Sequence, residues 1–189
     1  MTVSKSICKQ FLDTANRADP SIQGVFHKYV QDTLSATRVL ITPKPFQRER
    51  QFLSLRPNDY NGNVIKEAFA YIPQSTVGDN TGFSLLHLES NPDSAGAIVQ
   101  EGHDSLVQDI PDSPVGIYNQ LLRTNSAFDR QISFSNGIVV NIPIEAEIGY
   151  DFAERVKIKD FTLAGVKEAW QKLQDKVSQS NQILVAVAS

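Results

Sequence analysis

Apolar side chains recur at helical spacing in several stretches of the chain. Over residues 22–34 they follow the i, i+3, i+4, i+7 pattern that is typical of an amphipathic helix. Asp19 and Pro20 stand before this stretch, in the order of an N-cap and a first helical residue. Similar spacing predicts further helices over about 3–16, over 63–88 with an internal proline at Pro73, from Ser113 and Pro114 onward, and over 163–178.

Two stretches have the pattern of strands instead. Residues 99–111 read VQEGHDSLVQDIP, where two short runs flank Gly102, His103 and Asp104, and this predicts a β-hairpin. Residues 138–148 alternate apolar and polar side chains, which predicts one strand, placed at a sheet edge by Pro143. Residues 39–60 have the composition of a loop with short extended pieces.

The order of these elements predicts an α+β fold, in which helices pack on a small, largely antiparallel sheet. We expect about three strands in that sheet, fewer than a typical sheet contains. A sheet of that size leaves edges and apolar faces to be covered, so we expect a partner to complete it.

Composition narrows the class of protein. The 189 residues suffice for a sizeable core, and 41% apolar with 21% charged residues is ordinary for a globular protein. No apolar run approaches the roughly 18 residues of a membrane span, and the first residues lack the apolar core of a signal peptide. The single cysteine, Cys8, excludes an internal disulfide framework and suits a reducing compartment.

Charge is distributed unevenly along the chain. Residues 28–66 contain seven Lys or Arg and three Asp or Glu, which gives 7 − 3 = +4. Residues 67–112 contain eight Asp or Glu and no Lys or Arg, which gives −8. Such blocks form ordinary solvated faces in many proteins, but they also suit a protein that binds phosphates and presents carboxylates to cations.

Several common site motifs are absent from the sequence. It contains no GxGxxG, no GxxxxGK[ST] and no GxSxG pattern, and its three histidines lack paired metal-ligand spacing. The remaining chemical signal is a set of four short motifs in a fixed order. They are RVLITPKPFQRER over 38–50, QST over 74–76, HDS over 103–105 and PIEAEIG over 143–149.

This ordered series resembles the C-terminal part of the family A DNA polymerases, over about residues 4–155. The resemblance implies a template-dependent DNA polymerase whose end of the fingers and incomplete palm form this chain. His103 and Asp104 match the palm hairpin that the family calls motif C. Asp104 is then a ligand of the two Mg²⁺ ions of nucleotidyl transfer, and His103 a contact to the primer end. Magnesium prefers hard oxygen ligands and retains water, so one or two carboxylates suffice to bind it.

The resemblance also implies four contacts to primer-template DNA. Gln74 matches a glutamine that contacts the minor groove of the new base pair, where all correct pairs share acceptors. Lys66, Arg48 and Arg50 stand where they would bind backbone phosphates. A solvated helix lysine and surface salt bridges are the alternative interpretations of these three cations, and a turn residue that bonds a nearby carbonyl is the alternative for His103.

Some positions depart from the family pattern. Gly102 replaces an apolar residue, Ser105 replaces the commoner glutamate, and Ala70 replaces an asparagine that contacts DNA in some members. Phe46 and Gln47 stand where an apolar residue and a glycine are usual. Ser105 lacks a carboxylate, so it adds no metal ligand beside Asp104.

Two motifs that the family needs do not occur here. One is motif A, which supplies the second metal-binding aspartate, and the other is motif B, a fingers helix that binds the incoming deoxynucleoside triphosphate. The chain is then either the C-terminal subunit of a split polymerase or a fragment of a longer enzyme. We therefore expect activity only with an N-terminal polymerase chain that carries both motifs, in the cytoplasm of a bacterial or phage-infected cell. The expected divisions are a fingers-end segment over 1–62, a palm segment over 63–159, and a C-terminal helix and tail over 160–189.

Two other functions remain open from the sequence. The chain could be a non-catalytic DNA-binding or scaffold module derived from a polymerase. It could also be an unrelated α+β interaction protein in which the order of the motifs is a coincidence.

Overall fold

The computed structural model describes residues 22–55, 62–91, 96–102 and 104–187, and the chain forms two compact units, residues 1–76 and 77–189. The boundary between them lies inside the long helix α3 (Asn63–Glu89). The helix predicted over 3–16, the start at Asp19 and Pro20, and His103 lie outside the described residues. The division into segments 1–62, 63–159 and 160–189 stays a prediction.

The first unit begins with a π-helical turn, η1 (Ile22–His27), that continues into α2 (Lys28–Thr37). The helix ends at Arg38, which adopts a left-handed conformation (φ 57°) and donates its backbone N–H to the Leu34 carbonyl. Strands β1 (Val39–Ile41) and β2 (Glu49–Gln51) then pair antiparallel. The short extended pieces predicted within 39–60 are confirmed.

One apolar core joins these elements to the first half of α3. Val30 and Leu34 lie one helical turn apart on the buried face of α2, and Leu40 of β1 is buried in the same core. The buried members of this core are Val30, Leu34, Leu40, Phe52, Ile65, Ala68, Tyr71 and Ile72. The core fixes the β1–β2 hairpin, and therefore the arginines on it, against α3.

Helix α3 confirms the prediction that helical spacing continues through Pro73. A proline has no N–H, so the carbonyl of Phe69 loses the partner it would have in an uninterrupted helix. Thr76 donates its Oγ1 to the Ile72 carbonyl at 2.6 Å, one of three such hydroxyl-to-carbonyl bonds on this helix, with those of Thr81 and Ser84.

The predicted hairpin around Gly102 and Asp104 is confirmed. Strands β3 (Ala97–Glu101) and β4 (Leu106–Asp109) pair antiparallel, with a β-bulge at Val99. The backbone N–H of Gly102 donates to the Ser105 carbonyl at 2.7 Å, which closes the turn. A Cβ on Gly102 would lie 2.4 Å from the Ser105 hydroxyl oxygen, so glycine lets this turn close tightly.

Helix α4 (Pro114–Phe128) begins where the sequence predicts. Ser113 has an extended backbone (φ −153°, ψ 143°) and its side-chain oxygen accepts the N–H of Gly116 at 3.1 Å. Pro114 is the first helical residue, a position where its missing N–H has no intrahelical partner to lose.

The single strand predicted over 138–148 is wrong. Strand β6 (Val139–Val140) pairs with β5 (Ile132–Ser133), whereas β7 (Ala146–Gly149) pairs with β8 (Arg155–Ile158). Residues 141–145 belong to neither ladder, and Pro143 among them has no N–H to contribute to one. The alternating pattern therefore covers parts of two ribbons rather than one strand.

The mixed α+β class is confirmed, but the single small sheet is not. The described strands form four separate two-stranded antiparallel sheets, β1–β2, β3–β4, β5–β6 and β7–β8. In each of these ribbons, the two paired strands are consecutive in the sequence.

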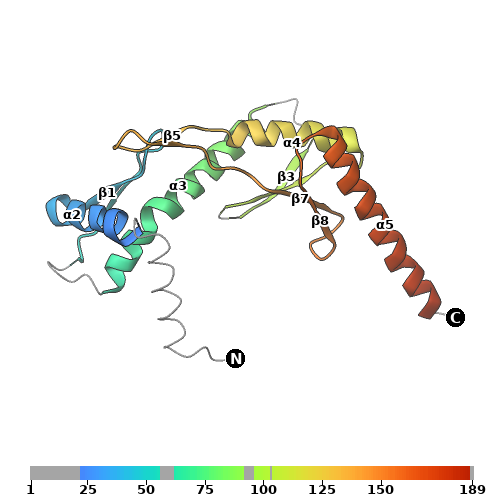
Figure 1. Ribbon diagram of the computed structural model, residues 1–189, viewed down its shortest axis with the longest axis horizontal. Helices are drawn as coiled ribbons and strands as arrows, with labels where there is room; N and C mark the ends of the chain where they lie inside the picture. The colour runs from blue at the N-terminus through green and yellow to red at the C-terminus, as the bar shows by residue number, and fades with distance from the viewer. Residues whose placement is uncertain (1–21, 56–61, 92–95, 103, 188–189) are drawn as a thin grey trace. The chain divides into compact units, whose positions relative to one another are not determined.

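The C-terminal helix, α5 (Leu163–Val187), packs on the β7–β8 ribbon and on α4 (Figure 1). It starts at the predicted residue and extends beyond the predicted end at 178. Its side chains Val166, Ala169 and Leu173 contribute to a core that also includes Ile117, Leu121, Ile148 and Ile158. This core holds the β7–β8 ribbon beside α4 in the second unit.

Candidate functional site

Asp104 occupies the turn between β3 and β4, and its side chain is exposed. It forms no hydrogen bond or ion pair with another described residue. Because a hydrogen bond closes this turn, the backbone around Asp104 can adopt few conformations, while the carboxylate stays accessible to solvent. The Asp104 side chain therefore makes no polar contact with another described residue that would hold the fold together, and its role as a metal ligand stays a prediction.

The turn borders a pocket of about 410 Å³ within the second unit. Its walls come from the second half of α3, from β4 and α4, and from the segment that leads into β7. Three carboxylates line it, those of Asp104, Glu145 and Glu147. None of its described lining residues is Lys, Arg or His.

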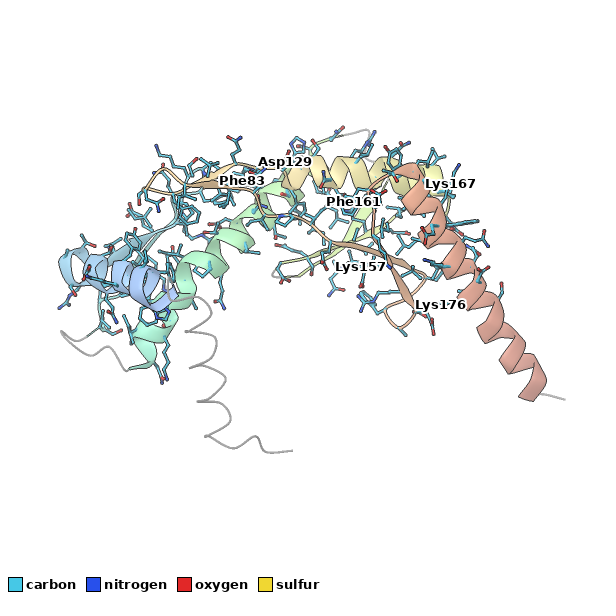
Figure 2. All side chains as sticks on the ribbon, in the orientation of Figure 1. Phe83, Asp129, Lys157, Phe161, Lys167 and Lys176 are labelled. Carbon is cyan, nitrogen blue, oxygen red and sulfur yellow. The ribbon has the colours of Figure 1, made fainter. Side chains whose placement is uncertain are left out.

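Two of these carboxylates have cationic partners on β8. Lys157, labelled in Figure 2, pairs with Glu145 at 2.7 Å, and Arg155 pairs with Glu147 at 3.1 Å. All four side chains are about half exposed or more, so each pair contributes little to stability.

A chain of polar side chains lies at the wall formed by β4 and α4. Gln120 donates its Nε2 to Gln108 Oε1 at 2.6 Å, and Gln108 donates its Nε2 to Thr124 Oγ1 at 3.0 Å. Gln120 and Thr124 are one helical turn apart, which places them on the same face of α4. The side chain of Gln120 is only 3% exposed, and its Oε1 has no hydrogen-bond partner among the described residues.

The sequence predicts that Asp104 binds magnesium. Asp104 offers the hard oxygen ligand that Mg²⁺ prefers. No group of three or more His, Cys, Asp or Glu side chains within the described part of the chain could hold a metal ion. Asp104 is thus a single candidate ligand among the described residues, and magnesium binding stays a prediction.

Arg50 and Arg48 lie on and beside β2 in the first unit. Arg50 forms an ion pair with Glu67 of α3, and its guanidinium lies 5.0 Å from the ring centroid of Phe52 and 5.7 Å from that of Tyr71. These contacts hold Arg50 in place while its side chain remains 43% exposed.

Arg48 is fixed through its backbone. Its N–H donates to Thr42 Oγ1 at 2.8 Å, and its carbonyl accepts from the Tyr71 hydroxyl at 2.9 Å. Because Tyr71 belongs to α3, this bond joins the β1–β2 hairpin to that helix. The Arg48 side chain itself is exposed.

Lys66 and Gln74 are exposed on α3. Lys66 directly precedes Glu67, the partner of Arg50, so the structure brings Lys66, Arg48 and Arg50 to the same part of the first unit. Asp104 belongs to the second unit. The roles that the sequence assigns to these residues stay predictions.

Sequence reasoning did not identify a bonded group around Asp112. Trp170 Nε1 donates to Asp112 Oδ1 at 2.8 Å, and the Tyr150 hydroxyl donates to Asp112 Oδ2 at 2.7 Å. Bonds from Trp170 and then Tyr150 lower the pKa of Asp112, while the bond to Asp112 raises the pKa of Tyr150. The partners are 58 and 38 residues from Asp112, so no local sequence pattern signals the group.

A buried polar stripe on α3 was also missed. Ser84 donates its Oγ to the carbonyls of Asn80 and Ala127, and Asn80 Oδ1 accepts from Arg130 Nη1 at 2.9 Å. Arg130 also lies over the ring of Phe83. The signal was present in the spacing, because Thr76, Asn80 and Ser84 recur every four residues along one helical face.

Comparison with models of protein families, with curated proteins and with solved structures gives no match for this chain. The resemblance to family A polymerases therefore depends on the sequence motifs. Across the described residues, no helix has both the length and the hydropathy that crossing a bilayer requires.

Proposed function

We propose that this chain is the C-terminal part of a template-dependent DNA polymerase related to family A, active with a second chain that carries motifs A and B. The observation that carries the proposal is the place of Asp104. It stands exposed at the turn of a two-stranded hairpin, in the sequence His-Asp-Ser, beside a pocket lined by further carboxylates.

Asp104 would hold magnesium through its carboxylate, with the partner's motif A aspartate as the second protein ligand. The chemistry that magnesium supplies when bound is activation of the primer hydroxyl and neutralisation of charge on the phosphates. The task of Asp104 is to present an oxygen ligand at a fixed position. The closed turn suits that task, because the Gly102–Ser105 bond limits how far the carboxylate can move.

The exposed cations of the first unit support the DNA-binding part of the proposal. Arg50 is held in one orientation by Glu67 and two aromatic rings, so less side-chain entropy is lost when its remaining donors bind a phosphate. Lys66 lies on the same helix as Glu67 and provides a second positive charge nearby. Gln74, two turns further along α3, would reach the minor groove of the primer terminus.

A primer-extension assay tests the proposal. The chain is incubated with primer-template DNA, deoxynucleoside triphosphates and magnesium, first alone and then with the polypeptide encoded just upstream of its gene. We expect extension only in the mixture. Extension by this chain alone would contradict the assignment of the second metal carboxylate to a partner.

The competing function is a polymerase-derived module that binds DNA without catalysis. This module would use the same exposed cations of the first unit, Arg48, Arg50 and Lys66, to bind DNA, but it gives Asp104 no role. DNA binding without extension in any mixture, and with no effect of Asp104→Asn, would favour this module over the polymerase.

A further inference from the structure

The ion pair between Arg50 and Glu67 lies at the surface of the first unit and joins strand β2 to helix α3. The side chain of Arg50 is 43% exposed and that of Glu67 is 53% exposed, so water and ions reach both partners. The attraction in such an exposed pair is weak, because solvent screens it. A second anion can therefore compete with Glu67 for the guanidinium.

Two aromatic rings hold Arg50 independently of Glu67. The guanidinium carbon of Arg50 lies 5.0 Å from the ring centroid of Phe52 and 5.7 Å from that of Tyr71. Both aromatic residues are buried, and their rings meet edge-on with centroids 5.9 Å apart. The Tyr71 hydroxyl donates to the Arg48 carbonyl at 2.9 Å, which fixes the Tyr71 ring against the hairpin. These contacts remain when the bond to Glu67 breaks, so Arg50 keeps its position.

Glu67 itself is held by Arg50 alone. Among the described residues, it forms a hydrogen bond or ion pair only with Arg50, and it accepts from Nη2 of the guanidinium. A guanidinium binds phosphate oxygens through two parallel N–H groups, so a carboxylate on one nitrogen does not use all of its donors. Loss of this bond releases a solvated carboxylate and leaves a fixed cation with its donors open.

The surroundings of the pair attract a polyanion. Lys66 directly precedes Glu67 on α3 and is exposed. A phosphate that approaches this surface is attracted by Lys66 and Arg50 and repelled by Glu67. Glu67 is therefore the negative charge that a phosphate must displace to reach Arg50.

We propose that Glu67 is a removable counter-ion of Arg50. Its carboxylate pairs with the guanidinium in the free chain, and a phosphate of the primer-template backbone displaces it when DNA binds. Glu67 then lowers DNA affinity, whereas Phe52 and Tyr71 keep the guanidinium in place for the phosphate. The inference rests on the proposed function, because it requires DNA at the first unit, and it adds a residue to which the sequence motifs give no role.

Fluorescence anisotropy of a labelled primer-template duplex, titrated with the full chain, tests the proposal. Glu67→Gln keeps the shape of the side chain and removes its charge. It should raise DNA affinity about two- to fivefold, which corresponds to about 0.4–1 kcal/mol, the strength of an exposed ion pair. The slope of log K against log salt should steepen by up to about 0.9, because the full charge of Arg50 then meets the DNA.

Glu49→Gln is the matched control. Glu49 is exposed and precedes Arg50 on β2, where successive side chains point to opposite faces of the strand. This variant removes the same charge without breaking the pair, so screening should limit its effect on affinity to less than about twofold.

A double-mutant cycle separates the pair from net charge. In an Arg50→Ala background, Glu67→Gln should change DNA affinity no more than Glu49→Gln does. Urea unfolding of Glu67→Gln checks that its fold is retained.

Three results would overturn the proposal. An unchanged or lower affinity of Glu67→Gln would mean that Glu67 only holds Arg50 in place. A gain equal to that of Glu49→Gln, or one that persists in the Arg50→Ala background, would mean a general effect of charge. Absence of DNA binding by the wild type would overturn the inference together with the proposed DNA contacts.

Primer extension distinguishes this inference from the proposed function. Extension by the two-chain mixture without a gain of affinity in Glu67→Gln would contradict the counter-ion role alone. A gain of affinity without extension in any mixture would support the counter-ion role and contradict the polymerase.

Discussion

Asp112 links side chains that are distant in the sequence but close in the second unit. It accepts bonds from Trp170 of α5 and from Tyr150, which follows β7, while Gln174 of α5 donates to the Tyr150 hydroxyl. This group fixes the first half of α5 to the turn that follows β7 and to the loop before α4. Its stability must depend on pH, because both bonds to Asp112 favour its ionised form.

The first prediction follows from the direction of the Asp112 pKa. Bonds from Trp170 and Tyr150 lower this pKa in the folded state from its ordinary value of 3.8. The stabilisation is therefore fully present above that value and is lost as pH falls through the lower folded-state pKa. Because Asp112 is exposed, we expect its contribution to stay below about 1 kcal/mol.

Urea unfolding followed by tryptophan fluorescence measures this effect. Trp170 is the single tryptophan of the chain, so the fluorescence signal reports on unfolding around Trp170, which bonds to Asp112. Between pH 5.5 and pH 3 the wild type should lose more unfolding free energy than Asp112→Asn, which cannot ionise. Equal losses in both proteins would contradict the assigned bonds.

The second prediction compares two glycines. A Cβ on Gly165, in the first turn of α5, would lie 2.3 Å from the backbone carbonyl oxygen of Asp160, whereas a Cβ on Gly82 of α3 meets nothing within 4 Å. Gly165→Ala should therefore destabilise the protein by about 1–3 kcal/mol through forced backbone movement. Gly82→Ala should stabilise it by up to about 1 kcal/mol through helix propensity. Denaturant midpoints that shift in the same direction for both variants would refute this explanation.

At the residue scale, the sequence could identify single residues with a local role, but not the side chains that they contact in the folded protein. The His-Asp-Ser turn, the Ser113 cap and the start of α5 are local features, so each was predictable from neighbouring residues. The bonds of Asp112, the orphan acceptor of Gln120 and the packing of Arg50 over Phe52 and Tyr71 depend on segments brought together by folding. A single sequence contains no local signal for such contacts.

At the scale of elements, helices were easier to predict than strands. Helix α3 was recognisable despite Pro73 because its apolar spacing continues on both sides of the proline. The 138–148 stretch failed because alternation extends over β6, an unpaired connection and part of β7, and the sequence does not show where pairing changes. Strands β5 and β8, of two and four residues, were not predicted.

The third prediction concerns Pro73, which is exposed inside α3. Pro73→Ala would restore the N–H that can bond to the Phe69 carbonyl. A proline in a helix interior costs roughly 3 kcal/mol, and greater freedom of the unfolded alanine chain offsets up to about 1 kcal/mol. We therefore expect a net stabilisation of about 2 kcal/mol, measured by urea unfolding.

Pro143→Ala is the matched control for this variant. Pro143 is exposed and lies outside the described helices and strands, so no helical hydrogen bond is restored there. Its replacement should reduce stability by up to about 1 kcal/mol through the unfolded chain alone. Stabilisation by both substitutions would contradict this explanation, because the gain at Pro73 would then not be specific to the helix.

At the scale of the whole molecule, much apolar surface of the ribbons is exposed. Val99 on β3 is 61% exposed, and Val139 and Val140 of β6 are also exposed. The four ribbons have only two strands each, so every one has edges that another strand could join. Both features agree with a chain that functions beside a partner, which is what the polymerase proposal requires.

The fourth prediction concerns binding of DNA to the basic surface of the first unit. Removal of one cation that binds a phosphate should reduce the slope of log K against log salt by about 0.9 for duplex DNA. Lys66→Ala should lower the slope by about that amount, and Arg50→Ala by less, because Arg50 already pairs with Glu67. Lys167→Ala is the control, since Lys167 is exposed on α5 of the other unit (Figure 2). An unchanged slope in Lys66→Ala would remove this lysine from the interface.

The most direct test of the polymerase proposal measures incorporation of one nucleotide by the assembled two-chain enzyme, with wild-type, Asp104→Asn and Glu101→Gln forms of this chain. Glu101 is an exposed carboxylate on the same hairpin and serves as the matched control. Loss of a metal ligand removes several kcal/mol of transition-state stabilisation, so Asp104→Asn should slow incorporation by about a hundredfold or more. Primer-template affinity and the Glu101→Gln rate should stay close to wild type. Incorporation by Asp104→Asn at the wild-type rate would show that Asp104 is not a metal ligand of the reaction and would contradict the proposal.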